Sequence, residues 1–365
     1  MKILHIIETL GRGGAERLLV VVLPELARQG HEVAAAVRSG PYDLQPELEE
    51  SGVPVIRLPK RKKWNLISGA RDIVSAMPDA DVLHAHLYFP AVNTALVRLL
   101  GLSSAKTCVT FHNQAYAGAN RDSLPLRLRK TLARWVYSRG IVVKLAVSHA
   151  VADHYRDALR LNSVGVLYNP IDLKAVNNIR MVPRAIDEPV HIVLPGRLVP
   201  EKGHLDLIAA LRDPRLADRS LRITFAGHGR LRAELQRLAG GLLFPLTITG
   251  ELDHARFLKL VSTADIVIIP SRFEGFGLTA LEAMSLSKPV IASTAGGLPE
   301  VLGDTGRLFE VGNVAAIAGA IVELADDPSL REYMGAAART RSEAEFSLPA
   351  ITSQLIELYE TLAPQ

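Results

Sequence analysis

The chain has 365 residues, of which 48% are hydrophobic and 22% charged, and this composition excludes an intrinsically disordered protein. A chain of this length is expected to form two domains. One cysteine excludes an intramolecular disulfide and a cysteine-cluster metal site, and it favours a reducing compartment. The net charge of +4 is uneven, because residues 1–180 hold 24 Lys/Arg against 15 Asp/Glu and the remainder is acidic. Either the N-terminal half meets an anionic partner or this is ordinary surface variation.

Short apolar, β-branched runs alternate with amphipathic stretches along the whole chain. The first run, residues 2–7, is predicted to be a strand rather than a signal peptide, because the N-terminal apolar segment leads into Gly-Arg-Gly-Gly at 11–14 without a small-residue cleavage site. Further strands are predicted at 32–37, 53–58, 80–86, 106–111, 141–148, 163–169, 191–196, 221–227, 246–250, 264–271 and 288–293. Helices such as 15–29 and 66–77 lie between them. This alternation predicts an α/β fold with right-handed βαβ units and parallel sheets, and no run reaches the ~18 apolar residues of a membrane span.

The alternation pauses in a segment rich in Pro, Asn and charge near 170–188, which predicts a domain junction. We expect an N-terminal, acceptor-binding Rossmann-like domain at 1–178 and a C-terminal, nucleotide-sugar-binding one at 179–346. The last stretch, 347–365, is predicted to be a helix that crosses back to the first domain. Ligands of such folds lie at the carboxyl ends of the strands, so a ligand is expected in a deep cleft between two facing domains.

A glycine-rich turn follows the first predicted strand. Gly11, Gly13 and Gly14 would let the backbone approach a ligand, and the helix that follows presents free amides suited to phosphate. The turn is not the dinucleotide fingerprint, since Glu16 replaces the third glycine and the second strand ends in Arg38 rather than an acid. A tight βα turn without a ligand remains the alternative.

The second half contains two cations in one loop, and two acids in a later loop and the helix that follows it. Arg197 and Lys202 follow a strand in LPGRLVPEKG, where they could stabilise a diphosphate leaving group without a metal. Glu274 lies in the turn of SRFEGFGLTALEAM, and Glu282 lies about one turn into the helix that begins near Gly277 or Leu278. A carboxylate there suits the neighbouring hydroxyls of a ribose, whereas the alternative is an acid paired with a nearby arginine.

Taken together, these motifs resemble the retaining glycosyltransferases of family 4, which have the GT-B fold and include many transferases of bacterial envelope glycans. The resemblance covers nearly the whole chain and its motifs occur in the family's order. They are the Gly-Gly loop at 13–14, HAH at 84–86, VTFHN at 109–113, VSHAVADHY, NPID, GRLVPEKG, FAGHGRLRAEL and the pair of glutamates.

The resemblance implies a role for each matching residue. Arg197 and Lys202 match the diphosphate-binding pair, Glu274 the acid on the donor sugar, and Glu282 the acid on the ribose. His112 matches a histidine that borders the reacting carbon. The remaining donor-binding positions are Gly13, Gly14, Leu252, Phe276, Gly277, Leu278 and Thr279, with Leu252 in the loop that reads the base through its main chain.

The resemblance also implies the reaction: a hexosyl group passes from a nucleoside-diphosphate sugar to a lipid-linked or envelope glycan acceptor. The anomeric configuration is retained, on one face of the sugar, with the leaving diphosphate taking the acceptor proton. We expect no cofactor and no metal. An epimerase of the same fold, a soluble acceptor and a non-catalytic binding module are the alternatives; a phosphorylase would need a pyridoxal-binding lysine that has no suitable context here.

Histidines and an acidic run could suggest a metal site, but their spacing argues against one. His84 and His86 stand at a strand end, and we expect at most one of them to face a ligand. Asp79 to Asp81 imitate the metal-binding D-x-D of another glycosyltransferase fold, yet they precede a strand, away from the expected cleft. His112 is therefore the one histidine with an expected catalytic role.

Two basic segments with aromatic residues predict a contact with an anionic membrane surface. The first holds Lys60, Arg61, Lys62 and Lys63 beside Trp64; the second holds Arg127, Arg129, Lys130, Arg134 and Arg139 with Trp135 and Tyr137. Cations beside interfacial aromatics suit acidic lipid, and no nucleic-acid recognition motif accompanies them. We expect a cytoplasmic protein attached to the inner face of the membrane, with a merely solvated basic face as the alternative.

Overall fold

The computed structural model describes residues 1–62, 65–117, 123–179 and 188–361. They form two compact units, Met1–Pro170 with Leu348–Gln365, and Ile171–Ser347. The division falls at Pro170 rather than at the expected residue 178, because the Ile171 amide donates to the Phe346 carbonyl at 2.8 Å and the short helix after it contacts the second unit. No helix in the described parts of the chain is long and apolar enough to cross a bilayer.

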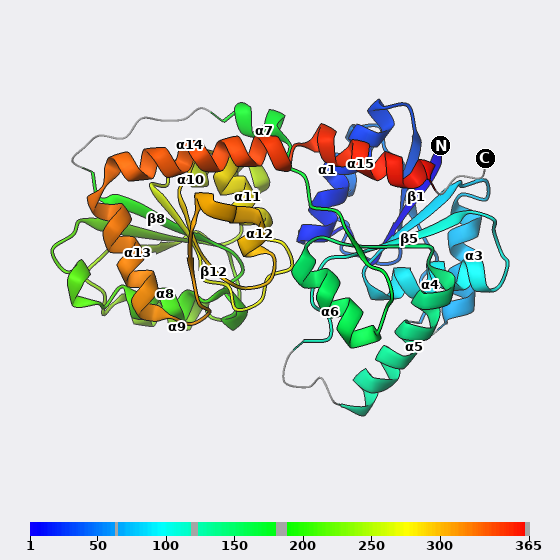
Figure 1. Ribbon diagram of the computed structural model, residues 1–365, viewed down its shortest axis with the longest axis horizontal. Helices are drawn as coiled ribbons and strands as arrows, with labels where there is room; N and C mark the ends of the chain where they lie inside the picture. Colours follow the sequence, from blue (N-terminus) through cyan, green and yellow to red (C-terminus); the bar gives the residue numbers. More distant parts are fainter. Residues whose placement is uncertain (63–64, 118–122, 180–187, 362–365) are drawn as a thin grey trace. The chain divides into compact units, whose positions relative to one another are not determined.

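The first unit is a seven-stranded, wholly parallel sheet in the order β3-β2-β1-β4-β5-β6-β7, with helices on both faces (Figure 1). Its strands are β1 (Lys2–Ile7), β2 (Glu32–Val37), β3 (Val55–Arg57), β4 (Val82–His86), β5 (Lys106–Phe111), β6 (Val143–Ala146) and β7 (Gly165–Val166). Its helices are α1 (Gly14–Arg28), α2 (Gln45–Glu50), α3 (Leu66–Ala76), α4 (Tyr88–Leu99), α5 (Leu124–Gly140), α6 (His149–Leu159) and α15 (Leu348–Glu360).

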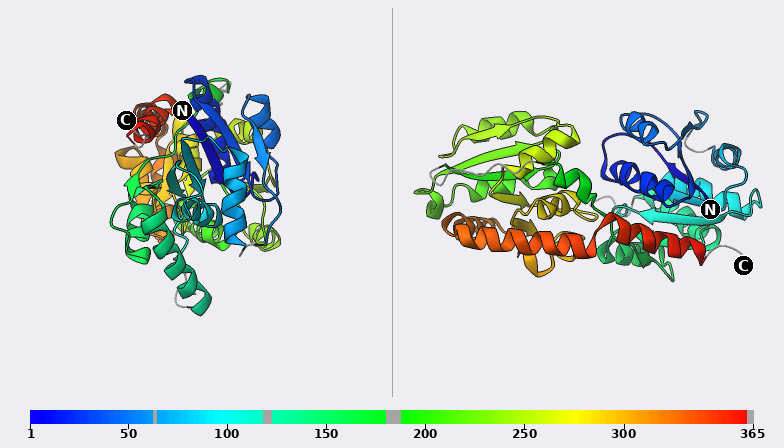
Figure 2. Two further views of the ribbon diagram at one scale, coloured as in Figure 1. Left: turned by 90° about the vertical axis from the view of Figure 1, so that its right-hand side faces the viewer. Right: turned by 90° about the horizontal axis from the view of Figure 1, so that it is seen from above.

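Strand alternation divides the core of the first unit between its two faces. In β1, Ile3 and Ile7 pack beneath α1 and α15, whereas Leu4 and Ile6 pack against α3. Helix α15 comes from the end of the chain, yet it lies beside α1 and completes this core with Leu355 and the other buried residues of its inner face (Figure 2). The same alternation assigns His5, between Leu4 and Ile6, to the face covered by α1 and α15.

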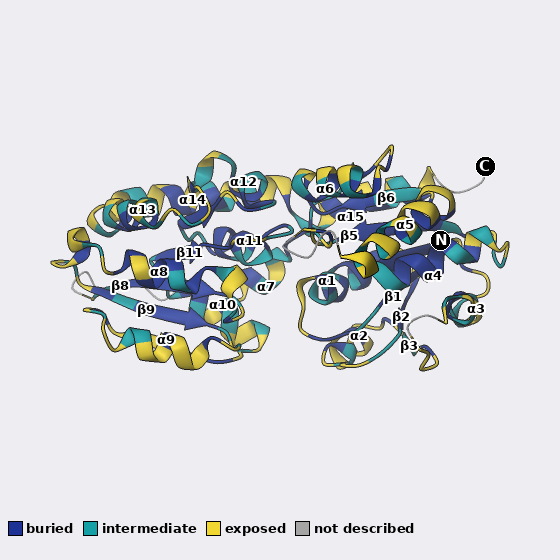
Figure 3. Cartoon of the chain, turned by 90° about the horizontal axis from the view of Figure 1, so that it is seen from below, coloured by how far each residue is buried: buried dark blue, intermediate teal, exposed yellow. Residues whose placement is uncertain are grey.

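The second unit is a six-stranded parallel sheet in the order β10-β9-β8-β11-β12-β13. Its strands are β8 (Val190–Pro195), β9 (Leu221–Ala226), β10 (Leu246–Ile248), β11 (Ile266–Ile269), β12 (Val290–Ser293) and β13 (Arg307–Phe309). Its helices are α7 (Leu173–Asn177), α8 (His204–Ala210), α9 (Arg232–Ala239), α10 (His254–Ser262), α11 (Leu278–Ser285), α12 (Leu298–Leu302), α13 (Val314–Asp326) and α14 (Pro328–Glu345). Its central strands are buried, as a parallel sheet with covered faces requires (Figure 3).

Both sheets therefore have the strand order of the Rossmann fold. In each unit the chain first adds strands on one side of its first strand and then crosses over to add strands on the other side, so the strand order reverses next to the first strand while all strands stay parallel. That reversal lies between β1 and β4 in the first unit and between β8 and β11 in the second. Loops at the carboxyl ends of these strands diverge there and leave room for a ligand. The loops after β1, β8 and β11 carry most of the residues singled out from the sequence.

Candidate active site

The two cations of the second unit lie on the loop after β8. Arg197 is exposed, and its side chain makes no hydrogen bond or ion pair among the described residues. Lys202 ends the 3₁₀ turn Pro200–Lys202, and its Nζ lies 2.6 Å from Oε2 of Glu274, on the loop after β11. Both partners of this ion pair are partly buried, with side chains 21% and 16% exposed. The loops at the two strands of the reversal point are thus joined by a charge pair.

The turn that carries Glu274 is held by close backbone packing. Ser271 Oγ donates to Glu274 Oε2 at 3.2 Å. A Cβ on Gly296, which has a φ of +54°, would lie 1.7 Å from the Glu274 carbonyl oxygen, so only glycine allows this approach. At Gly277, where φ is +110°, a Cβ would lie 2.7 Å from a methyl group of Leu298. The position of Glu274 is therefore fixed by its backbone.

The same turn opens directly into helix α11. Gly277 is its N-cap and supplies no side chain, so its first amides are not covered by a capping group. Leu278 and Thr279 are partly buried, and the preceding Phe276 is buried against the ring of Phe346. Uncapped amides at a helix N-terminus, with the helix dipole behind them, favour an anion. This helix start lies beside the Lys202–Glu274 pair in the loop after β11.

Glu282 lies on α11 and is paired with a histidine that sequence reasoning missed. Nε2 of His254, at the start of α10, lies 2.8 Å from Oε1 of Glu282. The acid is partly buried, so a partner was expected, but the arginine weighed as the alternative is a histidine here. Leu252 immediately precedes the N-cap Asp253 of α10 and is itself partly buried. The available signal for His254 was its position two residues after Leu252, directly after the segment expected to bind the base.

In the first unit, Gly13 and Gly14 form the start of helix α1 after β1. Gly13 is the N-cap, makes no side-chain cap, and is exposed together with Gly14. Glu16 Oε1 accepts a 2.8 Å hydrogen bond from Thr9 Oγ1, which braces the turn. The geometry fits both the tight βα turn and an anion-binding backbone.

His112 follows β5 and is partly buried, and its Nε2 lies 2.9 Å from Nδ1 of His86. Burial lowers the pKa of His112 to about 4, so the ring is neutral at pH 7. Its other nitrogen, Nδ1, has no hydrogen-bond partner among the described residues and is not enclosed. The ring is therefore held by a hydrogen bond at Nε2, while Nδ1 is open to a ligand.

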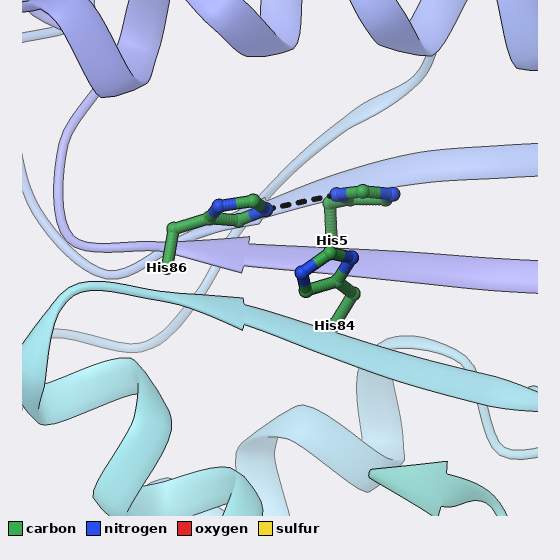
Figure 4. A group of neighbouring side chains, drawn as sticks. All are labelled: His5, His84 and His86. Atoms are coloured by element: carbon green, nitrogen blue, oxygen red, sulfur yellow. Dashed lines mark hydrogen bonds between the residues drawn. The ribbon is translucent and has the colours of Figure 1, made fainter. Parts of the chain in front are cut away.

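The expectation that at most one of His84 and His86 faces a ligand supposed that their side chains point to opposite faces of the sheet, and this is wrong. Residues two apart in a strand point to the same face, and the two rings stack with centroids 4.5 Å apart. Parallel register also places His5 of β1 opposite His84, and Figure 4 shows the three rings gathered between neighbouring strands. One ligand nitrogen from each lies within 4.8 Å of the others. Sequence reasoning missed this cluster because it did not combine register with alternation.

Asp79 and Asp81 lie at the amino end of β4. Asp79 forms an ion pair with Lys2, and Asp81 Oδ2 accepts from the Lys2 backbone amide at 2.7 Å. Both contacts join the amino ends of β1 and β4, the edge opposite to the loops described above. The two acids tie strands together.

Family models match most of the chain. The model described as Glycosyltransferase Family 4 matches residues 12–175, and the model described as Glycosyl transferases group 1 matches residues 176–341. The chain belongs to this glycosyltransferase family. Among curated relatives it is 26% identical to the alpha-D-kanosaminyltransferase of Streptomyces kanamyceticus, over 97% of each chain. It is 27% identical to the phosphatidyl-myo-inositol mannosyltransferase of Mycolicibacterium smegmatis, over 96% of this chain and 91% of the relative.

Solved glycosyltransferases have the same fold. HepE from Anabaena, solved in complex with UDP, superimposes with a TM-score of 0.82 at 20% identity, over 99% of this chain and 100% of that one. The lipopolysaccharide outer core galactosyltransferase WaaB gives a TM-score of 0.75 at 17% identity, over 99% of both chains. The predicted α/β class, two Rossmann-like domains and GT-B fold are confirmed. The family models, together with this fold, make the protein a glycosyltransferase.

Proposed function

We propose that this glycosyltransferase moves a hexosyl group from a nucleoside-diphosphate sugar to a lipid-linked or envelope glycan acceptor, with retention of configuration and without a metal. The observation that carries the proposal is the loop pair of the second unit, where Lys202 is paired with Glu274 just before the uncapped start of α11, and Arg197 lies on the same loop as Lys202. Cations and helix amides suit a diphosphate, while an acid beside them suits sugar hydroxyls. HepE, which shares the fold, was solved with UDP and with UDP-glucose.

Each charged group has a distinct part in this proposal. Arg197 and Lys202 stabilise the charge that develops on the leaving diphosphate, the work a metal ion does in other enzymes. Lys202 is paired with Glu274 in the free protein, so donor binding exchanges a carboxylate partner for phosphate. Glu282, which is paired with His254, accepts hydrogen bonds from the ribose hydroxyls. Glu274 accepts hydrogen bonds from the hydroxyls of the donor sugar and does not act as a nucleophile at the anomeric carbon. The transfer therefore takes place on one face of the sugar, with retention of configuration and without a covalent intermediate.

The leaving-group assignment is testable by substitution. Arg197→Ala and Lys202→Ala should each lower turnover by about a hundredfold or more, the loss typical of one strong charge-stabilising contact. Activity should persist in a chelator, because the cations replace a metal. Near-normal turnover in both variants would remove the diphosphate assignment, and loss on chelation with rescue by magnesium would remove the metal-free mechanism.

For the acceptor, we propose peripheral attachment to an acidic membrane through helix α5. Leu124, Leu128 and Trp135 are 68%, 64% and 48% exposed, and their spacing of four and seven residues places them on one side of the helix. Arg127 and Arg134 are also exposed and share a neighbouring side. Apolar side chains flanked by cations fit a lipid interface, at about 1 kcal/mol for each cation near acidic lipid.

Two details of the predicted basic segments change with the structure. Tyr137 is 1% exposed and packs against Phe111, so it belongs to the core and not to an interface. Arg61 forms a bidentate pair with Asp72, which reduces its attraction for lipid. Lys63 and Trp64 lie outside the described residues. The surface of α5 therefore carries the membrane proposal.

Two experiments test the two halves of the proposal. Thermal shift against a panel of nucleotide sugars should find a stabilising donor, because a ligand at ~100 times its dissociation constant adds about 2.7 kcal/mol. No response to any nucleoside-diphosphate sugar would remove the donor assignment. Sedimentation with vesicles should require acidic lipid and weaken at high salt, and should fall further in Leu128→Ser. Binding that ignores lipid charge would favour a soluble acceptor.

A further inference from the structure

A chain of hydrogen bonds runs from the C-terminal helix to His112 across the first unit. Tyr359, fully buried on α15, places its Oη 3.4 Å from Nε2 of His5. Nδ1 of His5 lies 3.0 Å from Nε2 of His86, and Nδ1 of His86 lies 2.9 Å from Nε2 of His112. The side branch is His84, whose Nδ1 lies 2.5 Å from the same Tyr359 oxygen.

The contacts of these histidines fit a hydrogen-bonded network better than a metal site or a substrate pocket. All six ring nitrogens of His5, His84 and His86 lie within hydrogen-bonding distance of a partner, the last being Nε2 of His84 at 2.7 Å from Thr110 Oγ1. A metal ion would have to break this set. The cavity beside the rings measures about 30 Å³, which is roughly the volume of a water molecule and far below that of a sugar. A hydrogen-bonded network is the arrangement that satisfies every group.

The number of protons in the network limits how the rings can be protonated. Burial lowers the pKa of His5, His84 and His86 well below the ordinary value, so each ring is neutral and carries one N–H. We assign the single proton of Tyr359 to the shorter of its two contacts, with Nδ1 of His84 at 2.5 Å, and under this assignment His84 donates from Nε2 to Thr110. The Tyr359 oxygen is left to accept from Nε2–H of His5.

Every later bond in the chain is then determined. Nδ1 of His5 has no proton and accepts from Nε2–H of His86. Nδ1 of His86 in turn accepts from Nε2–H of His112. The proton of His112 is therefore on Nε2, and Nδ1 keeps its lone pair. Because Nδ1 is the nitrogen that has no partner among the described residues, the acceptor side of this ring is the open side.

We propose that Tyr359, His5 and His86 are positioning residues that fix His112 in the Nε2-protonated tautomer, so that its bare Nδ1 accepts a hydrogen bond from a substrate hydroxyl. This inference rests on the proposed sugar transfer at His112, but the tautomer itself is a property of the free protein. Without the chain, a neutral imidazole samples both tautomers and can present an N–H, which a hydroxyl proton cannot approach. Helix α15, which follows the second unit in sequence, thereby sets the chemistry of a histidine in the first.

Nitrogen NMR of the ¹⁵N-histidine-labelled protein at pH 7.5 tests the tautomer, with the His112 signals assigned by His112→Gln. The wild type should show a protonated Nε2 and an unprotonated Nδ1 at His112. Tyr359→Phe, which keeps the ring and removes only the hydroxyl, and His5→Leu should both shift His112 toward a mixture. His5→Gln, whose amide can donate and accept, should restore part of the wild-type population. The matched control is Thr107→Val, which removes a buried hydroxyl on β5 that does not contact the histidines.

Several results would overturn the proposal. A proton on Nδ1 of wild-type His112 contradicts it without any variant, and so does a ring that Tyr359→Phe and His5→Leu leave unchanged. Stoichiometric Co²⁺ binding with a tetrahedral spectrum that His5→Leu abolishes would make the cluster a metal site instead. With the donor found by thermal shift, Tyr359→Phe should lower kcat by up to about a hundredfold with little change in KM. An unchanged kcat beside a shifted tautomer would refute the positioning role, whereas a wild type inactive on every donor would refute the proposed function alone.

Discussion

Acidification should destabilise the first unit, because its histidines are held neutral. His112 has an ordinary pKa of 6.5 and a folded pKa of about 4, lowered by burial. Between these pH values the unfolded chain binds a proton at this histidine that the folded chain does not. The contribution of His112 to the free energy of unfolding is therefore fully present above pH 6.5 and is lost as the pH falls toward 4. At pH 5 this one group should cost about 2 kcal/mol relative to pH 8. His5, His84 and His86 shift in the same direction and add to the loss.

Urea unfolding followed by tryptophan fluorescence measures this effect in one unit, since Trp64 and Trp135, the chain's two tryptophans, both precede residue 170. The midpoint should fall steadily between pH 8 and pH 5. In His112→Gln, which cannot titrate, the loss over the same range should be smaller by about 2 kcal/mol. Carboxylates that titrate in this range act equally in both proteins and cancel. A variant that loses as much stability as the wild type would show that burial does not hold His112 neutral.

The two glutamates should fail differently: Glu282→Gln should weaken both the donor and the free nucleoside diphosphate by calorimetry, since each carries the ribose. Glu274→Gln should damage transfer and leave nucleoside diphosphate binding intact or tighter, because it also releases Lys202 from its 2.6 Å ion pair; equal losses of nucleotide affinity would contradict this division. Gly277→Ala should lower the free energy of unfolding of the second unit by more than about 1 kcal/mol, because φ is +110° there. Gly240→Ala, at a φ of −61° with its nearest neighbour 3.5 Å from the new Cβ, is the control and should be close to neutral by calorimetry.

The fold was largely readable from the sequence, because apolar strands that are buried on both faces leave a strong pattern. Each predicted strand is present, and the start of α11 at Leu278 matches the glycine turn before it. The missed strand was β13, Arg307–Phe309, since three residues beside a glycine carry too little periodicity. The crossing of α15 to the first sheet was expected, but its buried Tyr359 was not singled out.

The site was readable only in part, because sequence reveals residue types more readily than their partners. The loops with Lys202 and Glu274 were identified separately, and their ion pair depends on β8 and β11 being neighbours across the strand reversal. His254 was missed because a histidine at a helix start has no fixed meaning without the neighbouring helix. The histidine cluster needed the register His5 opposite His84, which no local pattern specifies.

The central claim is transfer from a nucleoside-diphosphate sugar, and product analysis tests it most directly. With the donor selected by thermal shift and an extract of lipid-linked glycan as acceptor, the protein should release nucleoside diphosphate only when the acceptor is present. The new linkage should keep the donor's anomeric configuration in its NMR coupling constant. Release of nucleoside diphosphate that does not depend on acceptor, or a product of inverted configuration, would contradict the account.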